Sequence, residues 1–266
     1  ILALLLIPTN ASAARGPASF SMGRALIVAS SSPGNAYFVG ASVVNAAPVA
    51  GDLLALGGSV VTTAPVQGDG LLFAGSVSSR APILGDVRAV GGKVDIDAEG
   101  DISGDFIGLG FSVNNLGRVS GSTFIIAADA ILSGGAGGPV VVYGNNVSLE
   151  GDFAGDVTVT ALGRLQVAPD TVIRGALSYE APEAAVIPDS AQVIGGVEYT
   201  SASYLPDAGT SRFLALIGIG IFLLARVLGA LILAGLLAGL FPRLAEEVAA
   251  RVYEARPRSI LFTLML

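Results

Sequence analysis

The chain has 266 residues, of which 52% are hydrophobic, 13% are charged and 36 are glycine, and its formal net charge is −7. It contains no Cys and no His, which excludes a disulfide framework, a thiolate metal site and histidine acid–base chemistry in the sequence given. The acidic balance argues against nucleic acid as a partner, and we expect no enzymatic activity, no cofactor and no metal site.

Residues 1–13 have the pattern of the end of a secretory signal peptide. Pro8 breaks an apolar run, and Ala11-Ser12-Ala13 matches a cleavage site before Ala14. The alternative is a short apolar or disordered N-terminus. A signal peptide predicts that the domain after it is extracytoplasmic, and residues 14–33 are expected to form a lead-in and N-terminal cap.

Residues 34–203 repeat one phrase with a step of about seventeen residues. A glycine opens each unit, and the runs between the glycines are rich in Val, Leu, Ile and Thr, which is strand composition. A fixed period of this length predicts a solenoid. The glycines that open the units, and that we expect at the corners of the coils, are Gly51, Gly68, Gly85, Gly104, Gly121, Gly138, Gly155, Gly175 and Gly195.

The expected fold is mainly β, a parallel β-helix with a triangular cross-section. Each coil is predicted to contribute three short strands, and the coils are predicted to stack about 4.8 Å apart. Glycine is expected at the corners because the chain must turn there with φ values that other residues avoid. A single coil cannot close a core, so the stability must come from the stacking of neighbours.

The recurring Gly-Asp-Val/Leu, Gly-Gly and Ala-Pro-Val phrases resemble those of bactofilins, the polymer-forming cytoskeletal proteins of bacteria. The closing phrases at residues 172–179 and 195–199 resemble theirs too, and the resemblance covers residues 34–200. It implies a right-handed β-helix that joins end to end into nucleotide-free filaments, usually on the cytoplasmic face of the membrane. This chain departs from that pattern at both ends, so the resemblance is to a membrane-anchored variant.

Consecutive units open with Gly-Asp, which predicts a ladder of carboxylates along one corner. The ladder contains Asp52, Asp69 and Asp86, with Asp105 as a further candidate. Neighbouring carboxylates would lie about 5 Å apart and would repel modestly in water. A Ca²⁺ ladder is one interpretation, but Ca²⁺ needs six to eight oxygen ligands. Solvated turn carboxylates that bind their own backbone are the favoured interpretation.

The densest acidic segment contains Asp95, Asp97, Glu99 and Asp101. On a strand the first three would share one face, because residues two apart point the same way. A polysaccharide-active β-helix enzyme needs such a cluster, together with a groove of basic and aromatic side chains. Few basic residues lie nearby in the sequence, which favours a solvated face.

The remainder of the chain has the pattern of a membrane domain. Residues 204–211 are a short linker, and residues 212–241 are apolar over a length that predicts a transmembrane helix. Residues 242–258 carry four Arg and form a predicted amphipathic helix, which the positive-inside rule places in the cytoplasm. Residues 259–266 are apolar again and are expected to start a second transmembrane helix.

One charge, Arg226, lies inside the predicted transmembrane helix, where charge is costly. Small residues on the same helical face favour packing against another helix, with Arg226 turned toward protein. Snorkelling of the arginine to the membrane surface is the alternative. The predicted helix-packing residues are Arg226, Ala230, Ala234, Gly235, Ala238 and Gly239.

These patterns lead to one main hypothesis and two alternatives. The main hypothesis is a self-associating structural or scaffolding protein at the inner membrane of a bacterium, with its solenoid on the extracytoplasmic side. Its expected partners are other copies of itself and the lipid bilayer, with cell-wall or envelope proteins as further candidates. The alternatives are an accessory subunit of a membrane transport or channel assembly, and a β-helix polysaccharide-active enzyme.

Overall fold

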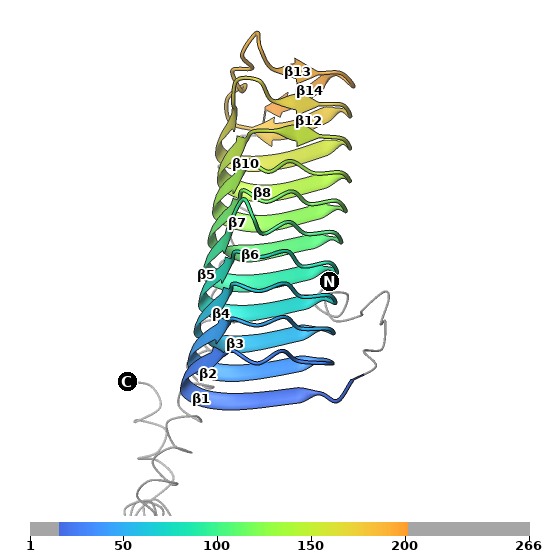
Figure 1. Cartoon of the computed structure of the whole chain (residues 1–266). Coiled ribbons are helices and arrows are strands. Elements are labelled where there is room, and N and C mark those ends of the chain that lie inside the picture. The colour runs from blue at the N-terminus through green and yellow to red at the C-terminus, as the bar shows by residue number, and fades with distance from the viewer. Residues whose placement is uncertain (1–15, 202–266) are drawn as a thin grey trace, which may run out of the picture. The chain divides into compact units, whose positions relative to one another are not determined.

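The structure is a computed structural model that describes residues 16–201. The regular elements in this part of the chain are all β-strands, and they stack into a parallel β-solenoid (Figure 1). Most coils advance by 17 residues, the separation between Asp52 and Asp69 at one corner. The predicted fold, a parallel β-solenoid with coils of about seventeen residues, is therefore confirmed.

Several sequence predictions concern residues outside the described part of the chain. They are the signal peptide at 1–13, the linker at 204–211, the helices at 212–241, 242–258 and 259–266, and the packing face around Arg226. Within residues 16–201, no helix has the length and apolar character needed to cross a membrane.

The main sheet has eleven strands, all parallel and arranged in chain order. At about 4.8 Å per step, this stack is roughly 48 Å long. The first strand of the sheet comes from the segment expected to be a lead-in. The strands are β1 (Ser19–Val28), β2 (Ala36–Asn45), β3 (Leu53–Thr62), β4 (Gly70–Ser79), β5 (Val87–Ile96), β6 (Phe106–Asn115), β7 (Thr123–Leu132), β8 (Val140–Leu149), β10 (Val157–Val167), β12 (Leu177–Ala181) and β14 (Val197–Ser201).

A second, narrower stack closes each coil on its remaining side. Three two-residue strands, β9 (Asp152–Phe153), β11 (Val172–Ile173) and β13 (Gln192–Val193), pair in parallel there. Single-residue bridges continue this stack down to the bridge between Ser32 and Val49. The coils therefore differ from the prediction of three similar short strands. In the coils of β1 to β7, one ten-residue strand forms two sides and a single bridge forms the third.

The long strands serve two sides because they bend in the middle. In β3, Leu53 and Ala55 are buried, and the next buried residues are Val60 and Thr62. An extended strand buries every second residue, so the odd separation between Ala55 and Val60 requires a bend. The pairing with β2 also skips one residue at this point, next to Gly57.

The core consists of columns of small and medium apolar side chains, one residue from each coil. Val49, Val66 and Ile83, on the narrow side, are fully buried and lie directly above one another. One polar pair is included in the core: Thr62 Oγ1 donates a hydrogen bond of 2.8 Å to Ser79 Oγ. Each column exists only because coils stack, which is the expected energetics of a solenoid.

The alternation of buried and exposed residues on the narrow side can be tested with two adjacent residues. Ile83 is completely buried, whereas Leu84 is 45% exposed. We expect Ile83→Ala to lower the free energy of unfolding by roughly 2–5 kcal/mol, because it leaves a cavity in the column. The control Leu84→Ala should change it by no more than about 0.5 kcal/mol. Urea unfolding followed by circular dichroism measures both, and equal losses would contradict the assignment of inside and outside.

Candidate functional surfaces

The glycines predicted at the corners lie in one column along the solenoid. The N–H of Gly68 donates to the carbonyl of Gly51 (3.0 Å), and the N–H of Gly85 donates to that of Gly68 (3.1 Å). The same bond joins Gly104, Gly121 and Gly138 to the glycine one coil earlier, and Gly195 to Gly175. Gly155 lies against Gly138 in the same column.

These corner glycines are not needed for an unusual φ, contrary to the reason expected from the sequence. Between residues 16 and 201, the glycines with positive φ are Gly135, Gly151 and Gly196, none of which opens a unit. The corners are instead crowded. A Cβ atom on Gly68 would collide with Asp52 Oδ1, and one on Gly85 would collide with Asp69 Oδ1. Glycine is required there because the carboxylate and the backbone of the previous coil occupy the space, and at Gly138, Gly155 and Gly195 the backbone alone does so.

The aspartates of the Gly-Asp phrases form a ladder with defined hydrogen bonds. Asp52 Oδ1 accepts the N–H of Asp69 (3.0 Å), and Asp69 Oδ1 accepts the N–H of Asp86 (2.8 Å). Asp86 Oδ1 in turn accepts the N–H of Asp105 (3.0 Å). Each carboxylate thus binds the backbone of the next coil, and not its own backbone as expected. The two residues of the Gly-Asp phrase act together. The glycine leaves space for the carboxylate of the previous coil, and the aspartate accepts a hydrogen bond from the N–H of the next coil.

The ladder also extends to residues that the sequence pattern did not single out. Asn35 Oδ1 accepts the N–H of Asp52 (3.0 Å), so an amide takes the place of a carboxylate at the first step. Asp105 Oδ1 accepts both the N–H and the hydroxyl of Ser122 (2.7 and 2.8 Å). In the described residues, no group of three or more acidic side chains is arranged to hold a metal ion.

The structure separates the acidic residues that were expected to share a strand face. β5 ends at Ile96, and the N–H of Gly100 closes a turn onto the carbonyl of Asp97 (2.8 Å). Glu99 lies in this turn, so Asp95, Asp97 and Glu99 do not line one side of a strand. The turn accommodates the two extra residues of this 19-residue unit.

Ion pairs and backbone contacts engage most of this acidic segment. Lys93 Nζ lies 2.6 Å from Asp95 Oδ2, and Arg80 Nε lies 3.6 Å from Asp97 Oδ2. Asp101 Oδ1 accepts a backbone N–H from the next coil (2.9 Å). These carboxylates point to separate partners and do not converge on a common site.

A surface that the sequence reasoning missed runs along the outer side of β1 to β8. The second and fourth residues of these strands point outward and stack into two columns. Arg88 occupies one of these positions, and every other position is apolar. We call this surface the apolar face; it comprises Phe20, Met22, Tyr37, Val39, Leu54, Leu56, Leu71, Phe73, Val90, Ile107, Leu109, Phe124, Ile126, Val141 and Tyr143.

Five side chains of the apolar face are exposed to solvent, and the other ten are half-buried. Phe20 is 75% exposed and Met22 is 81% exposed, while Ile126 and Tyr143 are 47% and 45% exposed. The ring of Phe20 stacks on that of Tyr37, with centroids 4.7 Å apart. Around the next corner one outward column is polar or charged from β2 onward: Ser42, Ser59, Ser76, Lys93, Ser112, Asp129, Asn146 and Arg164. The column beside it is mixed, and contains Ile27, Val44, Val61, Ser78, Asp95, Asn114 and Ile131.

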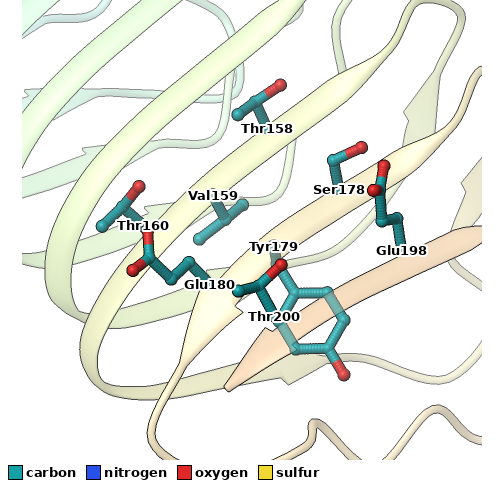
Figure 2. A pocket seen from close by; sticks show the side chains of 8 residues that line it. All are labelled: Thr158, Val159, Thr160, Ser178, Tyr179, Glu180, Glu198 and Thr200. Carbon is teal, nitrogen blue, oxygen red and sulfur yellow. The ribbon is translucent and has the colours of Figure 1, made fainter. Parts of the chain in front are cut away.

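Beyond β8 the columns of the apolar face continue as polar residues. A shallow groove of about 250 Å³ lies over Val159 and Tyr179, between the two continuing columns (Figure 2). Its rims carry hydroxyl and carboxylate groups and no basic side chain. One column is Thr158, Ser178 and Glu198, and the other is Thr160, Glu180 and Thr200.

Comparison with known proteins adds no assignment to these surfaces. No protein-family model matches the chain, and neither a curated protein nor a solved structure matches it. The solenoid expected from the repeat, and from the resemblance to bactofilins, is therefore established by the structure itself.

The ladder predicts a difference between removing the carboxylate and removing only its charge. We expect Asp105→Ala to lower the free energy of unfolding by about 1–2 kcal/mol, because the N–H of Ser122 loses its acceptor. Asp105→Asn should lose less, since Asn35 already performs this role in the first step of the ladder. Urea unfolding of both variants measures the difference, and equal losses would show that the hydrogen bond is not the stabilising contact.

Proposed function

We propose that the protein is a non-enzymatic scaffold of the bacterial cell envelope, a bactofilin-like solenoid whose rods join end to end. The observation that carries this proposal is the pair of open sheet edges at the two ends of the described solenoid. β1 and β14 each have a single neighbour in the main sheet. An unpaired strand edge presents free backbone N–H and C=O groups and is a template for another strand.

The edge at β14 also leaves core positions uncovered. Leu177 and Tyr179 are 0% and 5% exposed, because β14 lies on them. The equivalent residues of β14, Val197 and Tyr199, are 47% and 37% exposed. Another coil placed on β14 would bury them as β14 buries their counterparts. Burial of Val197 and Tyr199 would therefore favour the addition of a further coil at this edge.

All strands of the main sheet are parallel, so the two ends of the rod are different surfaces. Addition of a β1 edge to a β14 edge would continue the hydrogen-bonding pattern without changing direction. A head-to-tail contact of this kind does not close on itself and generates an open filament. End-to-end joining is therefore the form of self-association that the fold favours.

The proposed location is based on the sequence outside the described residues. The signal-like segment at 1–13, the apolar segment at 212–241 and the arginines of 242–258 support an inner-membrane anchor with the solenoid on the extracytoplasmic side. The bilayer would then be one partner, and cell-wall or envelope proteins would be others.

Two adjacent substitutions test the end-to-end contact. Val197→Lys puts a charge at an inward-facing position of the free edge, which we expect to prevent joining, because a buried unpaired charge is costly. Glu198→Lys is the control, since Glu198 points outward on the same strand. Sedimentation of the full chain in detergent should show no end-to-end polymers for Val197→Lys, and polymers for Glu198→Lys and the unchanged chain. Polymers that persist in Val197→Lys would exclude this edge as the joint.

A further inference from the structure

The apolar face is not required by the solenoid that carries it. The same outward positions hold Thr158 and Thr160 in β10, and Ser178 and Glu180 in β12, within one continuous sheet. Polar residues therefore suit these positions as far as the fold is concerned. Large exposed apolar patches on soluble surfaces mark interaction sites. The apolar residues on the outer side of β1 to β8 are therefore best explained by a binding partner, since the fold does not require them.

The one charged residue in the apolar face is already neutralised within the chain. Arg88 Nη2 lies 3.1 Å from Asp86 Oδ2, and Arg88 Nη1 lies 3.9 Å from Asp69 Oδ2. The Arg88 side chain is only 14% exposed. Covering the face would therefore not strand an unpaired charge, which is the usual cost of burying arginine at an interface.

The size of the apolar face matches what a pair of copies requires. Eight strands span about 34 Å, and two columns about 7 Å apart, with their side chains, give a width of roughly 15 Å. This corresponds to roughly 500 Å² on one copy and about 1,000 Å² over two, the lower limit for a specific interface. The outer surface of a sheet also packs well against another sheet, about 10 Å away.

We propose that the apolar face binds the apolar face of a second copy of this chain, side by side along the rod. This goes beyond end-to-end assembly, because it uses a different surface and does not need the ends to join. The charges at the face and its edge make a membrane surface a less favourable partner than a second copy. The face offers one cation, Arg88, and the Asp52, Asp69 and Asp86 corner runs along its edge. Anionic lipids would be repelled by that edge.

The charge distribution also selects a parallel arrangement of the two rods. One edge of the face is the aspartate corner. The opposite edge is a corner of mostly small residues without carboxylates, which contains Ala41, Gly58, Gly75, Gly92 and Ala128 together with Arg24 and Phe111. A twofold axis along the rod places the aspartates of each copy over the small corner of the other. An antiparallel pair would instead place the two carboxylate ladders together, with repulsion between like charges.

Single-cysteine cross-linking tests the pairing, because the chain has no Cys of its own. Ile126→Cys places the thiol on the apolar face, and Ile131→Cys places it on the polar outer side of the same strand β7. Ile126 and Ile131 are 47% and 44% exposed, so the two variants are matched. The full chain in expressing cells is treated with a short, membrane-permeable bismaleimide.

The expected result is an adduct of twice the chain's mass from Ile126→Cys and none from Ile131→Cys. An adduct of another mass would assign the face to a different protein. Absence of any adduct, with the Ile126→Cys thiol shielded from a monofunctional maleimide, would assign it to lipid, to the chain's own residues or to an antiparallel copy, in which β7 meets β2. Absence with a freely reactive thiol would show an uncovered face. Each of these three results overturns the proposal.

A second cysteine position tests the direction of the rods. In a parallel pair, Met22 of one copy lies near Met22 of the other, so Met22→Cys gives a dimer by itself. In an antiparallel pair Met22 of one copy lies against β8 of the other, and cross-linking requires Tyr143→Cys in that second copy. Adding Ile126→Glu to Met22→Cys should remove the dimer, and adding Ile131→Glu should not. A dimer that survives Ile126→Glu would contradict the assigned surface.

The two forms of self-association can be separated in the same assay. With Val197→Lys added, we expect the Ile126→Cys dimer to persist, because lateral pairing uses β1 to β8 and not the β14 edge. Loss of this dimer in the Val197→Lys chain would show that lateral pairing depends on joined ends, and would overturn its independence. If Val197→Lys keeps both the dimer and the polymers, the result contradicts the proposed end-to-end contact at β14 and leaves lateral pairing supported.

Discussion

The fold depends on the hydrogen bonds that join each coil to the next in a vertical register, which shifts between Ala161 and Arg164 of β10. Backbone bonds of 3.0 and 3.1 Å link Gly51, Gly68 and Gly85, and the carboxylate of each corner aspartate adds a second bond beside them. No coil has a core of its own, so every column of buried residues depends on this register. Residues that break the seventeen-residue step must leave the stack, as the turn after Asp97 shows.

This constraint acts on inward and corner positions and leaves the outward positions free. The chain uses that freedom unevenly. The two outer columns of the apolar face are apolar from β1 to β8, apart from Arg88, and continue as polar residues such as Thr158, Ser178 and Glu198. Surfaces that the fold does not specify are the ones available to partners. The scaffold proposal and the pairing proposal both follow from this separation, one from the sheet edges and the other from the outer face.

The sequence was sufficient to predict the solenoid, because the glycine register repeats through most of the described chain. It was not sufficient to explain the glycines, since the crowding of Gly68 by Asp52 exists only between coils. Nor did it show the single bent strand, because the pairing that skips a residue beside Gly57 is a three-dimensional event. The sequence did contain a signal for the apolar face. Leu54 and Leu71 are seventeen residues apart, and each directly follows the inward-facing first position of its strand, Leu53 or Gly70.

Electron microscopy of the full chain tests the central claim, that stacking continues from one molecule to the next. Filaments should show a repeat of about 4.8 Å along their axis that runs through the junctions between molecules. Rods that remain single at all concentrations, or filaments whose repeat is interrupted at each junction, would contradict it.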